Sequence, residues 1–237
     1  MQQNSADKEQ PILTAESPFR FSCNDNLPCF TQCCRDVNIY LTPYDVLRLR
    51  RALKLSSAEV LEQYTRYFLA GAGSIPVVQL LMDPGTLYCQ LVTDLGCAVY
   101  EDRPWSCRMY PLDVAEQEGQ YVTVVEKKRC LGLGEPSSST AGEWLQGQGL
   151  DGYVEMDRAF QSVVPEPGAE ILASHGQLLF LAYDLDRFKE MLKDSGFRKS
   201  CDVDDDLLRR VQEDDGALLM LAFRYIRNQL DELYQQS

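Results

Sequence analysis

The sequence predicts an α+β fold, in which a small cysteine-rich metal-binding domain of short strands and helices precedes a mainly helical C-terminal part. Two observations predict this division. Eight of the nine cysteines lie between Phe19 and Cys130, where short β-branched and aromatic runs alternate with helix-start signals. From Trp144 onward, apolar residues instead recur at helical spacing.

The chain divides into four predicted parts. Residues 1–18 are polar and are expected to form a flexible N-terminal segment, and residues 19–134 form the cysteine-cluster metal-binding domain. Residues 135–143 are rich in serine and are expected to be a linker. Residues 144–237 form the helical C-terminal region. The hydrophobic share of 45% is that of a globular chain and excludes general disorder.

Two helix starts are readable inside the cysteine-rich domain. Thr42 is an N-cap followed by Pro43, and Asp45 stands at the third helical position as a short-chain variant of a capping box. Ser56 and Glu59 repeat the arrangement. Both helices are therefore expected to begin at these caps.

Four short segments have the residue content of strands, and three longer ones have helical periodicity. The expected strands are Val37–Leu41, Val77–Met82, Leu87–Leu91 and Tyr121–Glu126. The expected helices are Ile171–Leu192 with Gly196 as its C-cap, Asp204–Val211, and Ala217–Leu233.

The charge and the apolar runs exclude several classes of partner. The net charge is −13 and the isoelectric point is about 4.5, so no basic surplus exists to bind a nucleic acid or an anionic membrane surface. No window approaches the roughly 18 apolar residues of a membrane span. The N-terminus has no secretory signal pattern, so the protein is expected to be cytoplasmic, where thiols stay reduced.

The cysteines fall into two groups with short internal spacings. The first group is Cys23-x5-Cys29-x3-Cys33-Cys34, and the second is Cys89-x7-Cys97-x9-Cys107 closed by Cys130. Four thiolates hold a tetrahedral zinc ion or an iron–sulfur cluster. The eight thiols are therefore predicted metal ligands, enough for one such site with reserves or for two. The alternatives are buried free thiols and a disulfide framework, which the clustering and the compartment disfavour.

The residue types around the cysteines bear on which metal is bound. His175 is the only histidine, which excludes a site of two cysteines and two histidines and makes a ligand role for His175 the less favoured reading. An all-thiolate set suits zinc and iron–sulfur equally. No pair of CxxC knuckles is present, which weakens a simple structural zinc site.

The cysteines and their neighbours resemble the family of zinc- or iron-chelating domains named after a CxxCxxCC signature, also called YkgJ-like cysteine cluster proteins. The resemblance covers about residues 19–134. It is carried by the first cysteine group with Leu41-Thr-Pro-Tyr-Asp-Val46, by Arg103-Pro-Trp-Ser-Cys107-Arg-Met-Tyr-Pro111, and by Cys130-Leu-Gly-Leu-Gly134. The first group departs from the family spacing because its loops are longer. The resemblance implies metal binding, and a relative, the flagellin lysine N-methylase, carries a similar cluster that implies an iron–sulfur centre.

Three residues near the second cysteine group are predicted to support the bound cofactor. Arg103 and Arg108 are cations that would offset the negative charge of a thiolate site, and Tyr110 would donate a hydrogen bond to a sulfur. The alternative is that the arginines pair with nearby acids and that the tyrosine is a core residue. A calcium loop at Asp202–Glu213 is disfavoured, because Leu207 stands where the turn needs glycine.

These observations favour a metal-binding protein that holds an iron–sulfur cluster, such as 4Fe-4S, or zinc, with a redox or electron-transfer role. One alternative is a metalloenzyme that performs methyl transfer or oxidation at an open metal position beside the two arginines. Another is a structural zinc scaffold. No catalytic residue is identified, and the partner is expected to be a protein or a small molecule.

Overall fold

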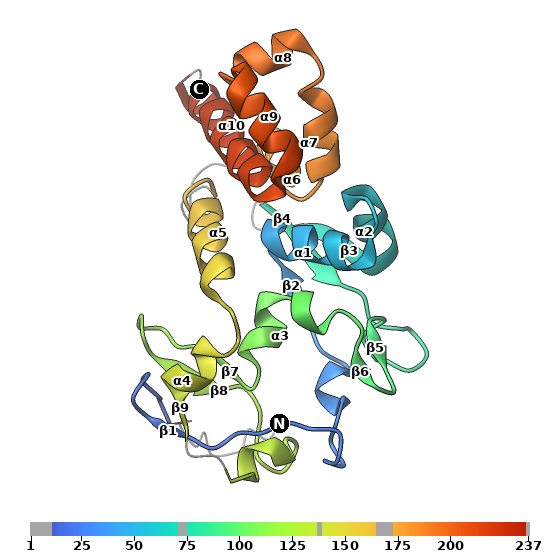
Figure 1. The fold of residues 1–237 in the computed structure, drawn as a ribbon, viewed down its shortest axis with the longest axis vertical. Helices are drawn as coiled ribbons and strands as arrows, with labels where there is room; N and C mark the ends of the chain where they lie inside the picture. The colour runs from blue at the N-terminus through green and yellow to red at the C-terminus, as the bar shows by residue number, and fades with distance from the viewer. Residues whose placement is uncertain (1–10, 71–74, 137–138, 165–172, 236–237) are drawn as a thin grey trace, which may run out of the picture. The chain divides into compact units, whose positions relative to one another are not determined.

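The computed structural model describes residues 11–70, 75–136, 139–164 and 173–235 (Figure 1). Among the described residues helices predominate, and the strands are short and form small sheets. The C-terminal part is helical, from α4 to α10. The predicted α+β class is therefore confirmed.

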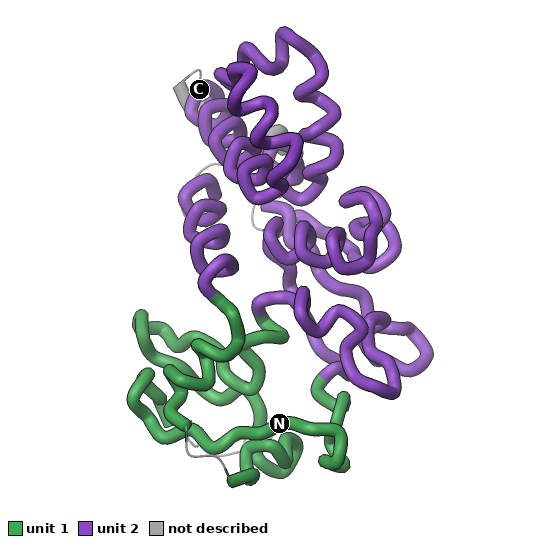
Figure 2. The backbone as a smooth tube through the Cα atoms, viewed as in Figure 1, with its two compact units in different colours: residues 1–33, 106–150 green, residues 34–105, 151–237 purple. Residues whose placement is uncertain are grey.

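The chain forms two compact units, each made from two separate stretches of sequence (Figure 2). Unit 1 contains residues 1–33 and 106–150, and unit 2 contains residues 34–105 and 151–237. Two short helices extend across these boundaries, η1 (Gln32–Cys34) and α3 (Trp105–Met109).

Unit 1 contains two small antiparallel sheets, each of two strands. One sheet pairs β1 (Pro18–Phe19) with β9 (Ser139–Thr140), and the other pairs β7 (Leu112–Val114) with β8 (Tyr121–Thr123). The turn η3 (Leu131–Gly134) and the helix α4 (Ala141–Gln146) complete the unit.

Parts of the predicted N-terminal segment and linker take part in this pairing. Leu13 forms a β-bridge with Tyr121, and Phe19 and Trp144 pack edge to face with ring centroids 5.3 Å apart. Thr140, within the predicted linker, is the N-cap of α4 and forms a capping box with Glu143. Residues 1–10 and 137–138, which belong to the same predictions, lie outside the described residues.

Unit 2 is built on a three-stranded antiparallel sheet in the order β2 (Tyr40–Leu41), β4 (Ile75–Leu80), β3 (Thr65–Ala70). A second sheet pairs β5 (Val92–Thr93) with β6 (Gly96–Cys97). The remaining elements are α1 (Pro43–Leu53), α2 (Ser57–Tyr64), η2 (Tyr100–Asp102), α5 (Asp151–Gln161), α6 (Ala173–Phe180), α7 (Leu185–Met191), α8 (Ser195–Ser200), α9 (Asp205–Glu213) and α10 (Asp215–Gln235).

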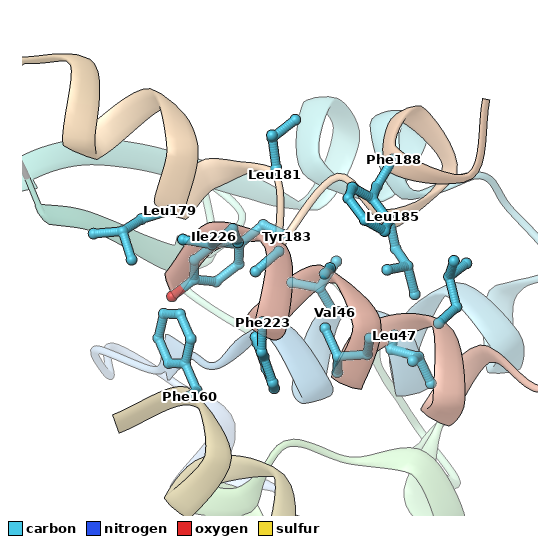
Figure 3. Packing of buried hydrophobic residues seen from close by; sticks show 14 of the residues in the cluster. Val46, Leu47, Phe160, Leu179, Leu181, Tyr183, Leu185, Phe188, Phe223 and Ile226 are labelled. Carbon is cyan, nitrogen blue, oxygen red and sulfur yellow. The ribbon is translucent and has the colours of Figure 1, made fainter. Parts of the chain in front are cut away.

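The main hydrophobic core lies in unit 2. Side chains of α1, α5, α6, α7 and α10 meet there, as Figure 3 shows for Val46, Phe160 and Ile226 among others. Val46 and Ile226 are almost completely buried. Burial of this apolar surface is the main stabilisation of the unit.

The capping predictions in this unit are confirmed. Thr42 caps α1 and Ser56 caps α2, and both capping boxes are complete. A partly buried ion network then joins the last turn of α1 to the starts of α7 and α10, because Arg50 donates to Asp186 at 2.7 and 2.8 Å and to Asp215 at 2.7 Å.

One strand prediction is wrong, and one long strand was not predicted. The segment Leu87–Leu91 is not a strand but forms isolated bridges at Tyr88 and Cys89. The reason is the preceding turn, in which Asp83 accepts backbone hydrogen bonds from Gly85 and Thr86 and the next residue adopts a left-handed φ of 63°. The strand β3 was not predicted at all, although it pairs with β4 along its full length.

The predicted helix Ile171–Leu192 is two helices in the structure, α6 and α7. Its first two residues lie outside the described residues. The break falls before Asp184, whose side chain caps α7 by accepting from the backbone N–H of Arg187. Gly196 is not a C-cap, since it lies inside α8. The two last predicted helices are confirmed as α9 and α10.

Among the residues that the structure describes, no helix is long and apolar enough to cross a membrane.

Candidate metal centre

Four of the predicted ligands share one neighbourhood in unit 1. They are Cys23, Cys29, Cys33 and Cys130. Burial, followed by the like charges of the neighbouring Cys33, Cys130 and Cys29, raises the pKa of Cys23 to about 11. Because solvent and salt screen such repulsion over distance, the effect indicates that the other three thiols lie near Cys23, although they come from distant parts of the sequence.

Hydrogen-bond donors in unit 1 point at two of these sulfurs. The backbone N–H of Leu131 donates to Sγ of Cys29 at 3.4 Å. Cys130 Sγ is close to the backbone N–H groups of Leu133 and Gly132 and to the hydroxyl of Tyr110. Burial raises the pKa of Cys130 overall, while these three donors act to lower it. Donors of this kind stabilise a thiolate, which is the form that binds metal.

The close approach of two backbone segments brings the first cysteine group to Cys130. The N–H of Ser22 donates to the carbonyl of Gly132 at 3.1 Å. A Cβ atom added at Gly132 would lie 2.8 Å from the carbonyl oxygen of Ser22 and 2.9 Å from the ring of Phe21. Only glycine therefore allows this packing, which sets Cys23 beside the turn that follows Cys130.

Three further cysteines lie in unit 2, where they form a second group. The backbone N–H of Cys89 donates to the carbonyl of Cys34 at 2.7 Å. Cys97 is in β6 and lies close enough to Cys89 to raise its pKa, although burial is the larger cause. The eighth predicted ligand, Cys107, is half-buried on α3 in unit 1.

The predicted supporting residues have different positions. Tyr110 lies in unit 1 with the four thiols, and burial followed by Cys130, Cys33 and Cys29 raises the pKa of its hydroxyl. Arg108 donates to the carbonyl of Gln148 at 2.6 Å. In unit 2, Arg103 donates to the carbonyl of Tyr100 at 2.6 Å and lies over the ring of the same residue.

The structure places two residues that sequence analysis disfavoured as metal ligands, one in the interior of a helix and one at a helix N-cap. His175 is buried in α6, with 1% of its surface exposed. Asp204, in the acidic stretch that resembles a calcium loop, caps α9 by accepting from the N–H of Leu207 at 2.7 Å.

Within the described residues, no group of three or more histidine, cysteine or acidic side chains is already gathered into a site that could hold a metal ion. The four thiols of unit 1 nevertheless suit a thiophilic metal. They lie near one another, and hydrogen-bond donors lie close to the sulfur of Cys130. Metal binding would draw the sulfurs together, as happens where binding is coupled to local folding.

Sequence analysis missed the backbone donors, although a signal for them was present. Cys130 is followed by Leu-Gly-Leu-Gly, and glycine after a cysteine lets the backbone N–H groups approach the sulfur. Sequence analysis also missed the backbone N–H groups of Leu91 and Val92, which lie near Cys89.

Comparison with known proteins supports the metal centre. Residues 22–131 match the family described as "CxxCxxCC: Putative zinc- or iron-chelating domain". The predicted resemblance is confirmed over this range, which includes all eight clustered cysteines. No curated protein and no solved structure matches the chain. The cysteine-rich segment is thus similar to domains described as zinc- or iron-chelating.

Proposed function

We propose that unit 1 holds an iron–sulfur cluster through Cys23, Cys29, Cys33 and Cys130, and that the protein acts in electron transfer. The observation that carries the proposal is the convergence of these four thiols together with donors aimed at sulfur. A cluster of this kind supplies one-electron chemistry when bound. The four thiolates would complete its coordination, so the proposed role needs no substrate at the metal.

The surroundings of the thiols support an iron–sulfur cluster over a structural zinc ion. Hydrogen bonds to thiolate sulfur are one of the means by which proteins set the reduction potential of a cluster. Leu131 donates such a bond to Cys29, and Tyr110 lies beside Cys130 with its hydroxyl directed at the sulfur. Cys23 is exposed while Cys130 is buried, so the centre would have one side near the surface, where electrons can enter and leave.

Metal and sulfide analysis of the full chain, purified without oxygen, tests this proposal. We expect a brown protein with iron and acid-labile sulfide, and loss of both in the variant Cys29→Ser. Cys201→Ala is the matched control, because Cys201 is the one cysteine outside the two groups and is expected to leave the metal content unchanged.

Two results would overturn the proposal. A colourless chain that contains zinc and no sulfide would exclude the iron–sulfur cluster. A Cys29→Ser variant that keeps the full metal and sulfide content would exclude the assigned ligands.

A further inference from the structure

Unit 2 contains a small cavity with an aromatic and acidic lining. Its volume is about 190 Å³, and it is lined by Thr42, Trp105, Tyr153 and Asp157. Three elements supply these residues: the start of α1, the first residue of α3, and one face of α5. A cavity of roughly 150 Å³ holds one benzene molecule, so this one admits a ligand of about six to eight non-hydrogen atoms.

Two aromatic side chains form part of the cavity wall. Tyr153 is buried, and its hydroxyl donates to the carbonyl of Arg103 at 3.0 Å. Its ring packs edge to face on Tyr44 with centroids 5.0 Å apart, so the ring is held in place. Trp105 is half-buried, and within the described residues its ring stacks on no other aromatic ring. The indole of Trp105 is therefore available to a ligand in the cavity.

Two carboxylates give the cavity a negative charge. Asp157 is half-buried in the lining and accepts from the side chain of Gln161. Asp45 lies directly behind the lining, because its buried carboxylate accepts from the backbone N–H of Thr42 at 2.8 Å and of Trp105 at 2.7 Å. Burial, and to a smaller extent the charge of Asp157, raises the pKa of Asp45, so the two carboxylates repel each other.

The donors to these two carboxylates are neutral. In the part of the chain that the structure describes, neither Asp45 nor Asp157 forms an ion pair with a lysine or an arginine. Arg48 lies over the ring of Tyr153, 5.7 Å from its centroid, but it pairs with Asp102 at 2.6 Å. Carboxylates that are removed from water without a counter-ion are costly, and a cationic ligand would offset that cost.

We infer that this cavity binds a small alkylammonium ion, with its positive group beside Asp157 and against Trp105 and Tyr153. Aromatic rings attract such a cation through their faces, and a carboxylate adds a charge of opposite sign. The aromatic lining favours an organic cation over a metal ion, because Ca²⁺ binds about six to eight oxygen atoms. The inference goes beyond the proposed function and is independent of it, since the proposed metal centre is in unit 1.

Calorimetric titration of the full-length chain with choline tests the inference. Salt at about 0.15 M screens the general attraction of a cation to the net charge of −13. We expect choline to bind at one site per chain. The neutral analogue of choline, in which carbon replaces the quaternary nitrogen, has the same shape without the charge. It is expected to bind at least about 10-fold more weakly.

Two substitutions on α5 separate the cavity from the charge of the whole chain. Asp157→Asn removes the carboxylate in the lining and keeps its size, so it is expected to weaken choline binding about 10-fold. Glu155→Gln makes the same change in charge at an exposed position of the same helix, and it is expected to leave the affinity unchanged. Both variants are expected to keep the metal content of the unchanged chain, which keeps the result separate from the metal centre.

Replacement of the indole tests the aromatic wall. Trp105→Leu keeps an apolar side chain and the backbone N–H that Asp45 accepts, and it is expected to weaken choline binding about 5-fold. Affinity that is unchanged in both Trp105→Leu and Asp157→Asn would place choline outside this cavity and overturn the inference.

Three other results would overturn the inference. Equal affinity for choline and its neutral analogue would show that the site does not recognise the charge. Equal losses in Asp157→Asn and Glu155→Gln would show attraction to the net charge alone. A variant that does not fold leaves a measurement on the unchanged chain, whose thermal unfolding midpoint choline should raise more than the neutral analogue does. A midpoint that does not change with choline would contradict binding.

Discussion

At the scale of single residues, Gly132 shows how a position without a side chain can bring proposed metal ligands together. Replacing it with alanine would press a methyl group against the carbonyl oxygen of Ser22 and the ring of Phe21. The two segments would then have to separate, at a cost of about 1–3 kcal/mol. We expect Gly132→Ala to lower the metal content of unit 1 and the stability of the holo protein, measured by metal analysis and thermal unfolding.

The matched control for this change is Gly134→Ala, in the same turn. A Cβ atom there would lie 2.8 Å from Cε of Lys127, which is the far end of a flexible and exposed side chain that can move away. Gly134→Ala is therefore expected to keep its metal. Equal loss of metal in both variants would show that the turn tolerates no added side chain at either glycine. A specific role of Gly132 in the packing against Ser22 and Phe21 would then be excluded.

At the scale of elements, Asp45 joins the starts of two helices. Its carboxylate accepts from the N–H of Thr42 at 2.8 Å, which completes the capping box of α1, and from the N–H of Trp105 at 2.7 Å, at the first residue of α3. Burial nevertheless raises the pKa of Asp45 to about 6, because desolvation outweighs these hydrogen bonds. The sequence indicated the first of these contacts and not the second.

The raised pKa of Asp45 gives the folding stability a defined pH dependence. The folded state binds this proton more tightly than the unfolded state, whose pKa is about 3.9. The stabilisation by the protonated group is therefore complete below pH 4 and is lost as the pH rises through about 6. We expect the stability of the unchanged chain, relative to Asp45→Asn, to fall by about 2 kcal/mol between pH 4 and pH 7.

Urea unfolding of both proteins at several pH values measures this difference. The asparagine variant does not titrate at position 45. Subtracting its unfolding free energy from that of the unchanged chain therefore cancels the pH dependence of the other acids, which both proteins contain. A constant difference in unfolding free energy between pH 4 and pH 7 would contradict the raised pKa.

The elements also show which parts of the fold could be predicted from the sequence. The capping boxes at Thr42 and Ser56 were predictable because a capping box involves only four consecutive residues. The break before Asp184 was not, since apolar spacing continues across it and the cap is strengthened by a distant partner, the hydroxyl of Ser57 at 2.8 Å. The strand β3 follows α2 directly, and its pairing with β4 is tertiary information.

The candidate site also has features that could be predicted from the sequence and features that could not. The eight thiols and Tyr110 could be found from composition, spacing and resemblance. Their division between the two units could not, because Cys33 and Cys34 are adjacent in the sequence and Cys130 is almost a hundred residues away. The backbone donors carry no side-chain signature and were found only through the structure.

At the scale of the whole molecule, the two units differ in what stabilises them. Every member of the main buried cluster belongs to unit 2. Among the described residues of unit 1, the buried apolar side chains are few: Phe19, Met109, Leu112, Cys130, Ala141 and Leu145. A unit of this size with so small a core needs another source of stability, and the proposed metal would supply it by binding only the folded form.

Removal of the metal is therefore expected to loosen unit 1 selectively. At a free metal concentration 100 times its dissociation constant, binding contributes about 2.7 kcal/mol, so chelation should speed amide hydrogen exchange in β7, β8 and η3 by about 100-fold. The amides of β4 and α10, which belong to the large core, should keep their protection. In Cys29→Ser the exchange of unit 1 should already be fast and chelation should change it little. An equal rise in both units after chelation would show that the metal does not stabilise unit 1 in particular.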